Sequence, residues 1–573
     1  MLLGTANLDL FMMFSKNLSK RENISFLKWA PGIVLVFIGL LIPLCGVFLF
    51  SLIGLSDRYT VSVLVGLHNY LDLIRDPGIY IYALGKSILM ALGVCLACLP
   101  VAWVAAYLLV RLPRDPLPWV LLVAAPFCSG LILRITALQL LFAPGGSFYS
   151  DIMYSNVGTF VGLSYIWLPF MILAIYLSLS RFPFKLVDVA RTNGASYFRT
   201  FLEVVLPMNA TGTLIGCAVV ILPVLASHIT PAFLGGPDGD LYGNYLVRQI
   251  DSTTYPKAAA MSVILLLTSG MFLLAMRYVW KIAISSPNWL KGMYMGLGAQ
   301  AHISVWKRNV WLNSPIIILV IIFYSFLYLP IVTLFFSSFS VNPAVLFPIE
   351  TTLEWYESLY NNWGIYKRAT VNSFWIGFWA STIALFIGFF AALDVRRSNY
   401  IPPVPALIFI LPIMLSPIII GIVQYLYFSK VGVTAGVMLA AVSNSIHLIG
   451  FSFLFCLIQL MVYNLKYEDV AKVHGAKFML RLTGVTLPLV WPGLVGTWII
   501  CFLIAFNDNG ITGYAVGAEP TLPTMIWGSL RYGLDGELWS LASLILFGVL
   551  LLIFIIYLLR SKVLSKQRWY THA

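Results

Sequence analysis

Long apolar stretches, separated by short polar segments, run along almost the whole chain. About 20 apolar residues in a helix cross the hydrocarbon core of a bilayer, because each residue adds about 1.5 Å. The pattern therefore predicts an all-α polytopic membrane protein with about 12 transmembrane helices. With soft edges, the twelve stretches are residues 29–53, 79–110, 117–142, 158–180, 209–234, 258–279, 312–337, 373–393, 403–428, 434–463, 491–515 and 539–559.

One polar segment between these stretches occurs twice. DVARTNGASYFRTFLEVVLP at Asp188–Pro207 is followed 281 positions later by DVAKVHGAKFMLRLTGVTLP at Asp469–Pro488. Shorter echoes lie 286 positions apart, at Tyr70 and Tyr356, Ser87 and Ser373, and Arg111 and Arg397. Each half contains six stretches, an even number, so both halves keep the same orientation. We expect two parallel six-helix repeats related by a pseudo-twofold axis along the membrane normal.

The repeat divides the chain into five parts. The two halves are separated by a polar linker and flanked by a short segment at each end. The parts are an N-terminal segment 1–28, a first half 29–279, a linker 280–311, a second half 312–559 and a C-terminal tail 560–573.

Positive charge predicts the orientation. If residues 1–28 are cytoplasmic, the segments on their side of the membrane hold 24 of the 35 Lys and Arg residues. Cytoplasmic loops are enriched in these residues, so we expect both termini in the cytoplasm. The net charge of +13 is then explained by topology, without nucleic acid as a partner. The N-terminus lacks the pattern of a cleaved signal peptide, so the first span is expected to remain.

Each copy of the repeated segment lies between the fourth and fifth spans of its half, on the cytoplasmic side. Residues 185–193 and 466–474 are expected to form a short helix with an aspartate in its first turn. A glycine then allows a sharp turn, and a proline is expected to end the second helix before the next span. An alanine, a small residue, stands at the same position of both copies, which indicates close packing there. We name residues 185–207 and 466–488 the first and second elbows. Their marked positions are Asp188, Ala190, Gly194 and Pro207, and Asp469, Ala471, Gly475 and Pro488.

The elbows resemble the EAA motif of ABC importer permeases. The glycine and the Leu-Pro pair match in both copies, whereas Asp188 and Asp469 stand where the family has Glu. The resemblance implies that each elbow docks into a cleft on an ATP-hydrolysing subunit and transmits its closure. It also implies two copies of that subunit, which hold ATP and Mg, and a periplasmic or lipid-anchored substrate-binding protein. The location implied is the bacterial cytoplasmic (inner) membrane.

The chain itself shows no nucleotide-binding motif. Gly85–Ser87 reads GKS, but six residues separate Gly78 from Gly85, where a phosphate-binding loop needs four. We therefore predict no ATPase activity, no catalytic residues and no cofactor for this chain. Cys95 and Cys98 form a CxxC without a second ligand pair, which favours packing over a metal site.

A finer resemblance covers most of both halves. Thr230–Gln249 resembles the first permease of spermidine/putrescine importers, and Thr352–Tyr360 and Phe506–Ser543 resemble the second. The chain thus looks like both permeases fused, which implies a polyamine or related amine as the substrate. Fused permeases for ferric iron or thiamine are alternatives. A secondary transporter is a rival from another class, but it would leave the elbows unexplained.

Two charged residues fall inside the predicted spans and are candidates for the substrate pathway. Asp508 is the only acid in a span, and it either faces the pathway or bonds to nearby backbone. Arg134 either pairs with a carboxylate or contacts substrate. The predicted outer loops hold 13 acids against 8 bases, which would concentrate cations at the entrance. His447 is expected to be a packing residue.

Overall fold

A computed structural model describes most of the two halves. The described residues are 37–55, 61–75, 78–111, 130–142, 152–180, 182–284, 314–341, 350–397, 408–462, 466–529 and 536–548, with single positions near 119–126 and 550–554. The predicted terminal segments 1–28 and 560–573 lie outside the described residues, as do residues 285–311 of the linker and Cys128.

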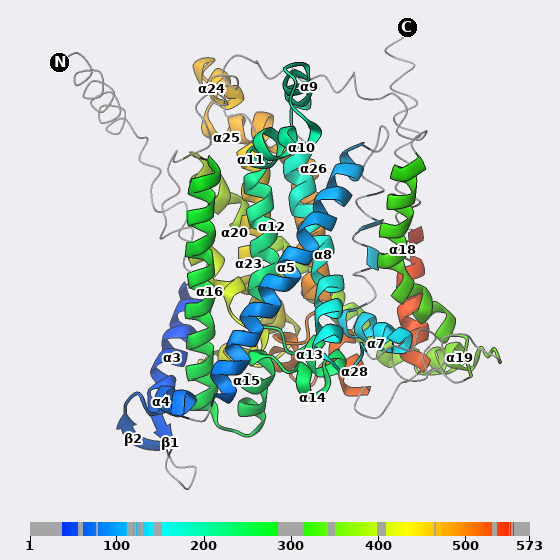
Figure 1. The fold of residues 1–573 in the computed structure, drawn as a ribbon. Coiled ribbons are helices and arrows are strands. Elements are labelled where there is room, and N and C mark those ends of the chain that lie inside the picture. Colours follow the sequence, from blue (N-terminus) through cyan, green and yellow to red (C-terminus); the bar gives the residue numbers. More distant parts are fainter. Residues whose placement is uncertain are drawn as a thin grey trace.

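The described chain is almost entirely helical (Figure 1). In the first half the elements are η2 (Phe37–Leu41), α3 (Ile42–Ser51), β1 (Ile53–Leu55), β2 (Val61–Val65), α4 (His68–Arg75), α5 (Ile79–Arg111), α7 (Leu131–Phe142), α8 (Asn156–Leu179), α9 (Lys185–Thr192), α10 (Tyr197–Thr200), η4 (Phe201–Val205), α11 (Leu206–Met208), α12 (Ala210–Leu225), α13 (Ile229–Leu234), α14 (Gly236–Gly239), α15 (Tyr242–Asp251) and α16 (Tyr255–Ile284). In the second half they are α18 (Ser314–Ser337), α19 (Glu354–Asn361), α20 (Trp363–Arg397), η6 (Leu411–Met414), α22 (Pro417–Lys430), α23 (Val437–Val462), α24 (Lys466–Val473), α25 (Phe478–Arg481), η7 (Leu482–Thr486), α26 (Leu487–Phe506), α27 (Thr512–Ala515) and α28 (Leu522–Ser529).

Several helices are long and apolar enough to cross a membrane. Among the described residues five qualify singly, and three more spans result if helix pairs bent by 75°, 105° and 66° each count as one. Four shorter apolar helices lie at Ile42–Ser51, Leu131–Phe142, Ile321–Ser337 and Gly536–Gly548. The bends differ from the straight helices that the apolar pattern predicted. Hydropathy reports the length of an apolar stretch and carries no information on its direction.

A small strand pair is the other departure from the helical prediction. β1 and β2 form an antiparallel pair that precedes α4. Asn69 of α4 anchors the pair, because its side-chain amide donates to the carbonyls of Ser51 and Ile53 at 2.8 and 2.9 Å. Figure 1 places this hairpin at the end of the molecule opposite α9 and α24.

The same helix packing occurs in both halves. α5 and α12 pack on α8 in the first half, and α20 and α26 pack on α23 in the second. Across the halves, α8 and α12 contact α23. The central helices of both halves therefore share one core.

The first helix of each half leans on the other half. α3 packs on α22, and α18 packs on α7. Polar side chains hold these contacts within the apolar surroundings: the Tyr324 hydroxyl donates to the carbonyl of Trp119 at 2.9 Å, and the Tyr328 hydroxyl to that of Leu122 at 2.7 Å. On the other side, the Gln424 amide donates to the Gly39 carbonyl at 2.7 Å. The first helix of each half thus packs on a helix of the other half, and these contacts hold the two halves together.

Side-chain hydrogen bonds also recur at corresponding positions. The hydroxyls of Ser51 and Tyr70 lie 2.7 Å apart, and those of Ser338 and Tyr356 lie 2.8 Å apart. Each of two buried serines accepts a hydrogen bond of 2.9 Å from a backbone N–H at the start of an outer helix. These pairs are Ser87 with Tyr242 and Ser373 with Leu522. Ser87 of the GKS tripeptide is thus a structural residue within the first third of α5.

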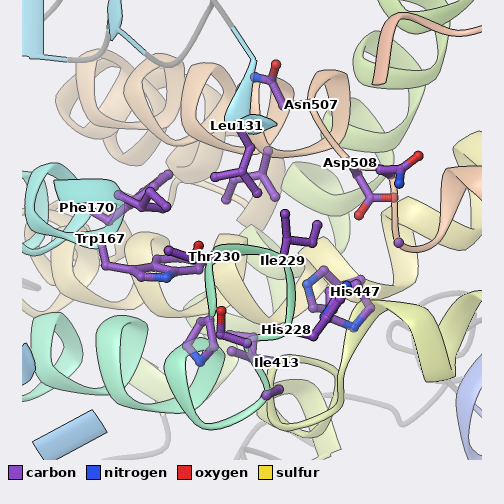
Figure 2. A pocket seen from close by; sticks show the side chains of 18 of the residues that line it. Leu131, Trp167, Phe170, His228, Ile229, Thr230, Ile413, His447, Asn507 and Asp508 are labelled. Carbon is purple, nitrogen blue, oxygen red and sulfur yellow. The ribbon is translucent and has the colours of Figure 1, made fainter. Parts of the chain in front are cut away.

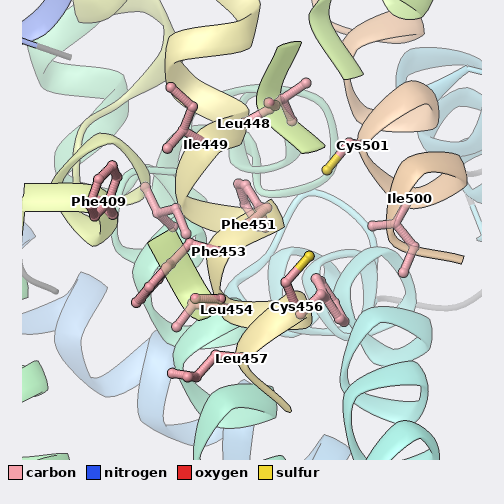
Figure 3. Close-up of a cluster of buried hydrophobic side chains, with 14 of the residues drawn as sticks. Phe409, Leu448, Ile449, Phe451, Phe453, Leu454, Cys456, Leu457, Ile500 and Cys501 are labelled. Carbon is pink, nitrogen blue, oxygen red and sulfur yellow. The ribbon is translucent and has the colours of Figure 1, made fainter. Parts of the chain in front are cut away.

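The shared core is densest where α20 crosses α23. Figure 3 shows buried side chains of α23, with Phe453 on the side of Phe409 and Cys456 nearer to Cys501 and Ile500 of α26. Gly388 of α20 lies at the crossing. A Cβ added there would lie 2.5 Å from the Ser452 hydroxyl and 2.7 Å from the backbone nitrogen of Phe453. Only glycine allows so close a backbone approach.

Gly388→Ala is therefore expected to destabilise the protein by about 1–3 kcal/mol, because α20 and α23 must move apart. The thermal midpoint of the detergent-purified chain, followed by fluorescence-detected size exclusion, measures the change. Gly364→Ala in the same helix is the control, since no atom lies within 4 Å of its added Cβ. Equal midpoints for the two variants would contradict this account of the crossing.

Candidate functional site

The two elbows have the same backbone structure. The predicted short helices are confirmed as α9 and α24, with Asp188 in the first turn of one and Asp469 in the first turn of the other. Gly194 and Gly475 follow with φ of 85° and 80°. A five-residue π-helical segment, η4 or η7, then continues from α10 or α25 towards the next span.

Matching backbone hydrogen bonds close both turns. The N–H groups of Gly194 and Ala195 donate to the carbonyls of Arg191 and Ala190 at 3.0 and 3.1 Å. In the second elbow, Gly475 and Ala476 donate to Lys472 and Ala471 at 3.0 and 3.0 Å. A Cβ at either glycine would meet no atom within 4 Å. The glycines are therefore required by the left-handed backbone and not by lack of space.

The prolines do not end the second helix of the elbow, contrary to expectation. Pro207 lies inside α11, and Pro488 lies in the first turn of α26. The bends come later, 75° between Met208 and Ala210 and 66° between Trp491 and Gly493. Proline is tolerated in the first turn of a helix, and the preceding π segment shifts the hydrogen-bond register around it.

The elbows lie together at one end of the molecule. Figure 1 places α9 and α24 at the end opposite α13, α14 and α15. Ala190 and Ala471 are half-buried, whereas both turns expose apolar side chains. The largest are Phe198 and Leu202 in the first elbow, and Val470, Val473, Met479 and Leu480 in the second. Exposed apolar patches mark surfaces that contact another protein or lipid.

A cavity of about 160 Å³ lies between the two halves, away from the elbows. Its wall is mainly apolar and aromatic, and Figure 2 shows Trp167 and Phe170 on the side opposite Asp508 and His447. Many lining residues are equivalents 281 positions apart. These pairs are Ile166 and His447, Phe170 and Phe451, Pro223 and Ile504, Ala226 and Asn507, Ser227 and Asp508, and His228 and Asn509.

Asp508 lines this cavity, but it does not lie within a helix. α26 ends at Phe506, and α27 begins at Thr512. In the break, Oδ2 of Asp508 accepts hydrogen bonds of 2.9 Å from the N–H groups of Ile511 and Thr512, and one of 3.1 Å from the Thr512 hydroxyl. The carboxylate thus bonds to nearby backbone, as one alternative drawn from the sequence has it, and it also faces the cavity; its place in a substrate pathway stays a prediction.

Arg134 and His447 line the same cavity. Arg134 is buried in α7, where its Nε donates to the Gly130 carbonyl at 3.1 Å. His447 lies 3.1 Å, through Nδ1, from the Pro412 carbonyl, which agrees with the predicted packing role. The structure therefore brings both candidate pathway residues, Arg134 and Asp508, to one cavity between the halves.

Sequence reasoning missed the aromatic wall and His228. Trp167, Phe170 and Phe451 lie in apolar helices, where aromatic residues are common and carry no signal of their own. The 281-residue offset between the two halves could have identified His228 from the sequence. Carried beyond the elbows, it pairs Ser227 and His228 with Asp508 and Asn509.

An outer chamber of about 620 Å³ adjoins this cavity. His228, Asn509 and Gly510 line both. The chamber also contains Asp251 and an ion pair between Asp240 and Arg248. It is bordered by α15, at the end of the molecule opposite the elbows (Figure 1). The two cavities thus follow one another from that end towards the middle.

Comparisons with known proteins give the family. Residues 78–281 match the family described as binding-protein-dependent transport system inner membrane component. Spermidine/putrescine transport system permease protein PotB of Escherichia coli (strain K12) is 31% identical over 238 residues, 39% of this chain and 86% of the relative. PotB of Salmonella typhimurium (strain SL1344) is 29% identical over 273 residues, which are 45% of this chain and 93% of the relative. Spermidine/putrescine transport system permease protein PotC of Haemophilus influenzae is 27% identical over 243 residues, which are 42% of this chain and 93% of the relative.

These similarities agree with the resemblance found in the sequence. The chain is about twice as long as the relatives, which is consistent with a fusion of two permeases. Permeases of this kind are not ATPases themselves, and they work with ATP-binding and substrate-binding partners. The apolar helices fit a multi-pass inner-membrane protein. The chain belongs to the family of inner-membrane components of binding-protein-dependent transport systems, the permeases of ABC importers.

Proposed function

We propose that this chain supplies both transmembrane halves of an ATP-driven importer, which moves a small substrate from an external binding protein into the cytoplasm. The duplicated elbow carries the proposal. Both copies have the same turn, the same aspartate position and an exposed apolar surface, at one end of the molecule. A secondary transporter has no use for two such surfaces.

The proposed architecture has twelve spans in two six-helix repeats, 29–279 and 312–559, joined by a linker at 280–311. The long helices, bent pairs and shorter apolar helices of the described residues each overlap a different one of the twelve apolar stretches. Equivalent helix packing and equivalent cavity positions support a pseudo-twofold axis through the cavity. Positive charge on the elbow side supports cytoplasmic termini.

Each elbow is proposed to dock one copy of an ATP-binding subunit, which holds ATP and Mg. Two elbows require two copies. The marked positions serve this docking in different ways: the glycines set the turn, the alanines keep the short helix close to the body, and the aspartates stabilise the start of the helix. The outer chamber, at the other end, is where a periplasmic or lipid-anchored binding protein would deliver substrate.

The substrate is proposed to be a polyamine or a related amine. The relatives are named as spermidine/putrescine permeases, and the cavity offers what a cationic amine needs. Asp508 supplies negative charge, and Trp167, Phe170 and Phe451 supply aromatic faces. Arg134 in the same cavity opposes a second positive charge, so it is assigned to positioning in preference to contact with the amine. Ferric iron and thiamine remain the alternative substrates.

Replacing both elbow glycines, Gly194→Val and Gly475→Val, is expected to reduce uptake more than tenfold. Left-handed φ costs about 1–2 kcal/mol for each ordinary residue, and more for a β-branched one. Uptake into cells and ATP hydrolysis stimulated by the binding protein measure the effect in the assembled complex. Gly364→Val serves as the control, because this exposed glycine lies outside the elbows and has neither a positive φ nor a close neighbour. Normal stimulation in the double variant would rule out docking through these turns.

Asp508→Asn is expected to reduce spermidine or putrescine uptake at least about tenfold, because loss of a buried counter-charge costs roughly 2–5 kcal/mol. Asparagine retains an oxygen that can accept the hydrogen bonds from Ile511 and Thr512, so the charge is tested apart from the turn.

Asp508→Ala, which loses both charge and acceptor, reports the structural cost of the turn. Glu519→Gln, on the exposed surface beside Arg368, controls for removal of an outer carboxylate. Unchanged uptake in Asp508→Asn would exclude Asp508 from the pathway. If the wild-type complex takes up thiamine or ferric iron and no polyamine, the substrate class is wrong while the importer function stands.

A further inference from the structure

The two elbows and the spans beside them differ at three buried or half-buried positions, although the backbones of the elbows match. One position lies on the first short helix, one at the end of the π segment, and one at the elbow end of the long second span. Polar residues occupy all three positions in the second half, and valines occupy all three in the first. The pairs are Glu468 and Val187, Thr486 and Val205, and Arg396 and Val110.

The polar set ties three elements of the second half together. Glu468 of α24 is only 5% exposed, and its Oε1 accepts a hydrogen bond of 2.6 Å from the Thr486 hydroxyl at the end of η7. The charge of Glu468 also acts on the guanidinium of Arg396 in α20. Arg396 is held in turn, because its Nε donates to the Leu460 carbonyl of α23 at 3.0 Å. The hydrogen bond thus fixes α24 to the start of α26, and the opposite charge of Arg396 at the end of α20 favours the same arrangement.

The valine set joins the same three elements by apolar packing. Val205 of η4 is buried, and Val187 of α9 and Val110 of α5 pack half-buried against the same hydrophobic cluster. Apolar contacts have no preferred direction, so they allow small rotations that a hydrogen bond resists.

Burial makes the polar set an all-or-none arrangement. A carboxylate removed from water is costly unless its partners are present, so loss of Thr486 or Arg396 removes one of the groups that stabilise the buried Glu468. Replacement of the whole set by apolar residues of similar volume is usually tolerated. The first half shows that an all-valine set is compatible with this backbone.

We propose that Glu468 is a positioning residue that locks the short helix of the second elbow to the end of α20 and the start of α26, whereas apolar side chains at the equivalent positions leave the first elbow without this lock. The two elbows then transmit motion of the docked subunits unequally. The lock itself depends only on contacts within this chain and goes beyond the proposed transport function.

Hydrogen exchange of the full chain in lipid nanodiscs tests the lock without any partner. Glu468→Val is expected to raise exchange in residues 466–486 at least about tenfold and to leave 185–205 unchanged. Glu468→Gln, which keeps the shape, is expected to give a smaller rise in the same segment, and it serves if the valine variant does not fold. Glu203→Gln is the control, since this carboxylate pairs with Arg199 on the exposed surface. No rise in either Glu468 variant, or an equal rise in both elbows, would overturn the proposal.

The triple variant Arg396→Val, Glu468→Val, Thr486→Val separates locking from packing. This variant has the valines of the first half at all three positions. Hydrogen exchange in residues 466–486 is therefore expected to return to within about threefold of the wild type. Uptake of labelled spermidine per ATP hydrolysed, measured in the complete complex, is nevertheless expected to stay below half of the wild-type ratio. If the triple variant takes up as much spermidine per ATP hydrolysed as the wild type, apolar packing is sufficient for coupling and the proposed lock is wrong. Absence of spermidine uptake by the wild type would contradict the proposed substrate, and the exchange result would still decide the lock.

Discussion

Backbone polar groups in an apolar medium must be satisfied within the protein, and the rest of this structure follows from that constraint. Helices meet it along the apolar stretches, and every interruption needs a polar side chain to take over. Asn209, between α11 and α12, donates to the Val205 carbonyl at 2.8 Å and accepts from Ser178 at 3.1 Å. After α26, the Asp508 carboxylate likewise accepts hydrogen bonds from the backbone N–H groups of Ile511 and Thr512. Both of these interruptions, among the residues that the structure describes, are thus satisfied by a side chain of the protein itself.

The same constraint explains why the cavity lies where helices stop. The break after α12 and the break after α26 contribute Ser227 and His228 on one side and Asp508 and Asn509 on the other. A non-helical backbone at this depth is tolerated only beside protein or a polar cavity. The broken ends thus create the polar part of an otherwise apolar wall, and their equivalence in the two halves places it between them.

Duplication preserved the backbone and let side chains diverge. The turns at Gly194 and Gly475 share their φ values and hydrogen bonds, because the left-handed conformation leaves little freedom. At positions without such a demand the halves differ, as with Ser227 and Asp508 in the cavity. One negative charge therefore faces one side of a cavity whose lining comes from equivalent positions of the two halves.

The sequence by itself determined the apolar stretches, the repeat and the two elbows, because each depends on residues close together in the chain. Helix length follows from hydropathy, and the turns follow from glycines whose φ is a local property. The tertiary structure decided the bends beyond Pro207 and Pro488, the β1–β2 hairpin, the partners of Asp508 and the aromatic wall at Trp167. These features depend on which helices meet across the two halves. Hydropathy cannot distinguish a side chain that faces lipid from one that faces a cavity, since both surroundings favour apolar residues.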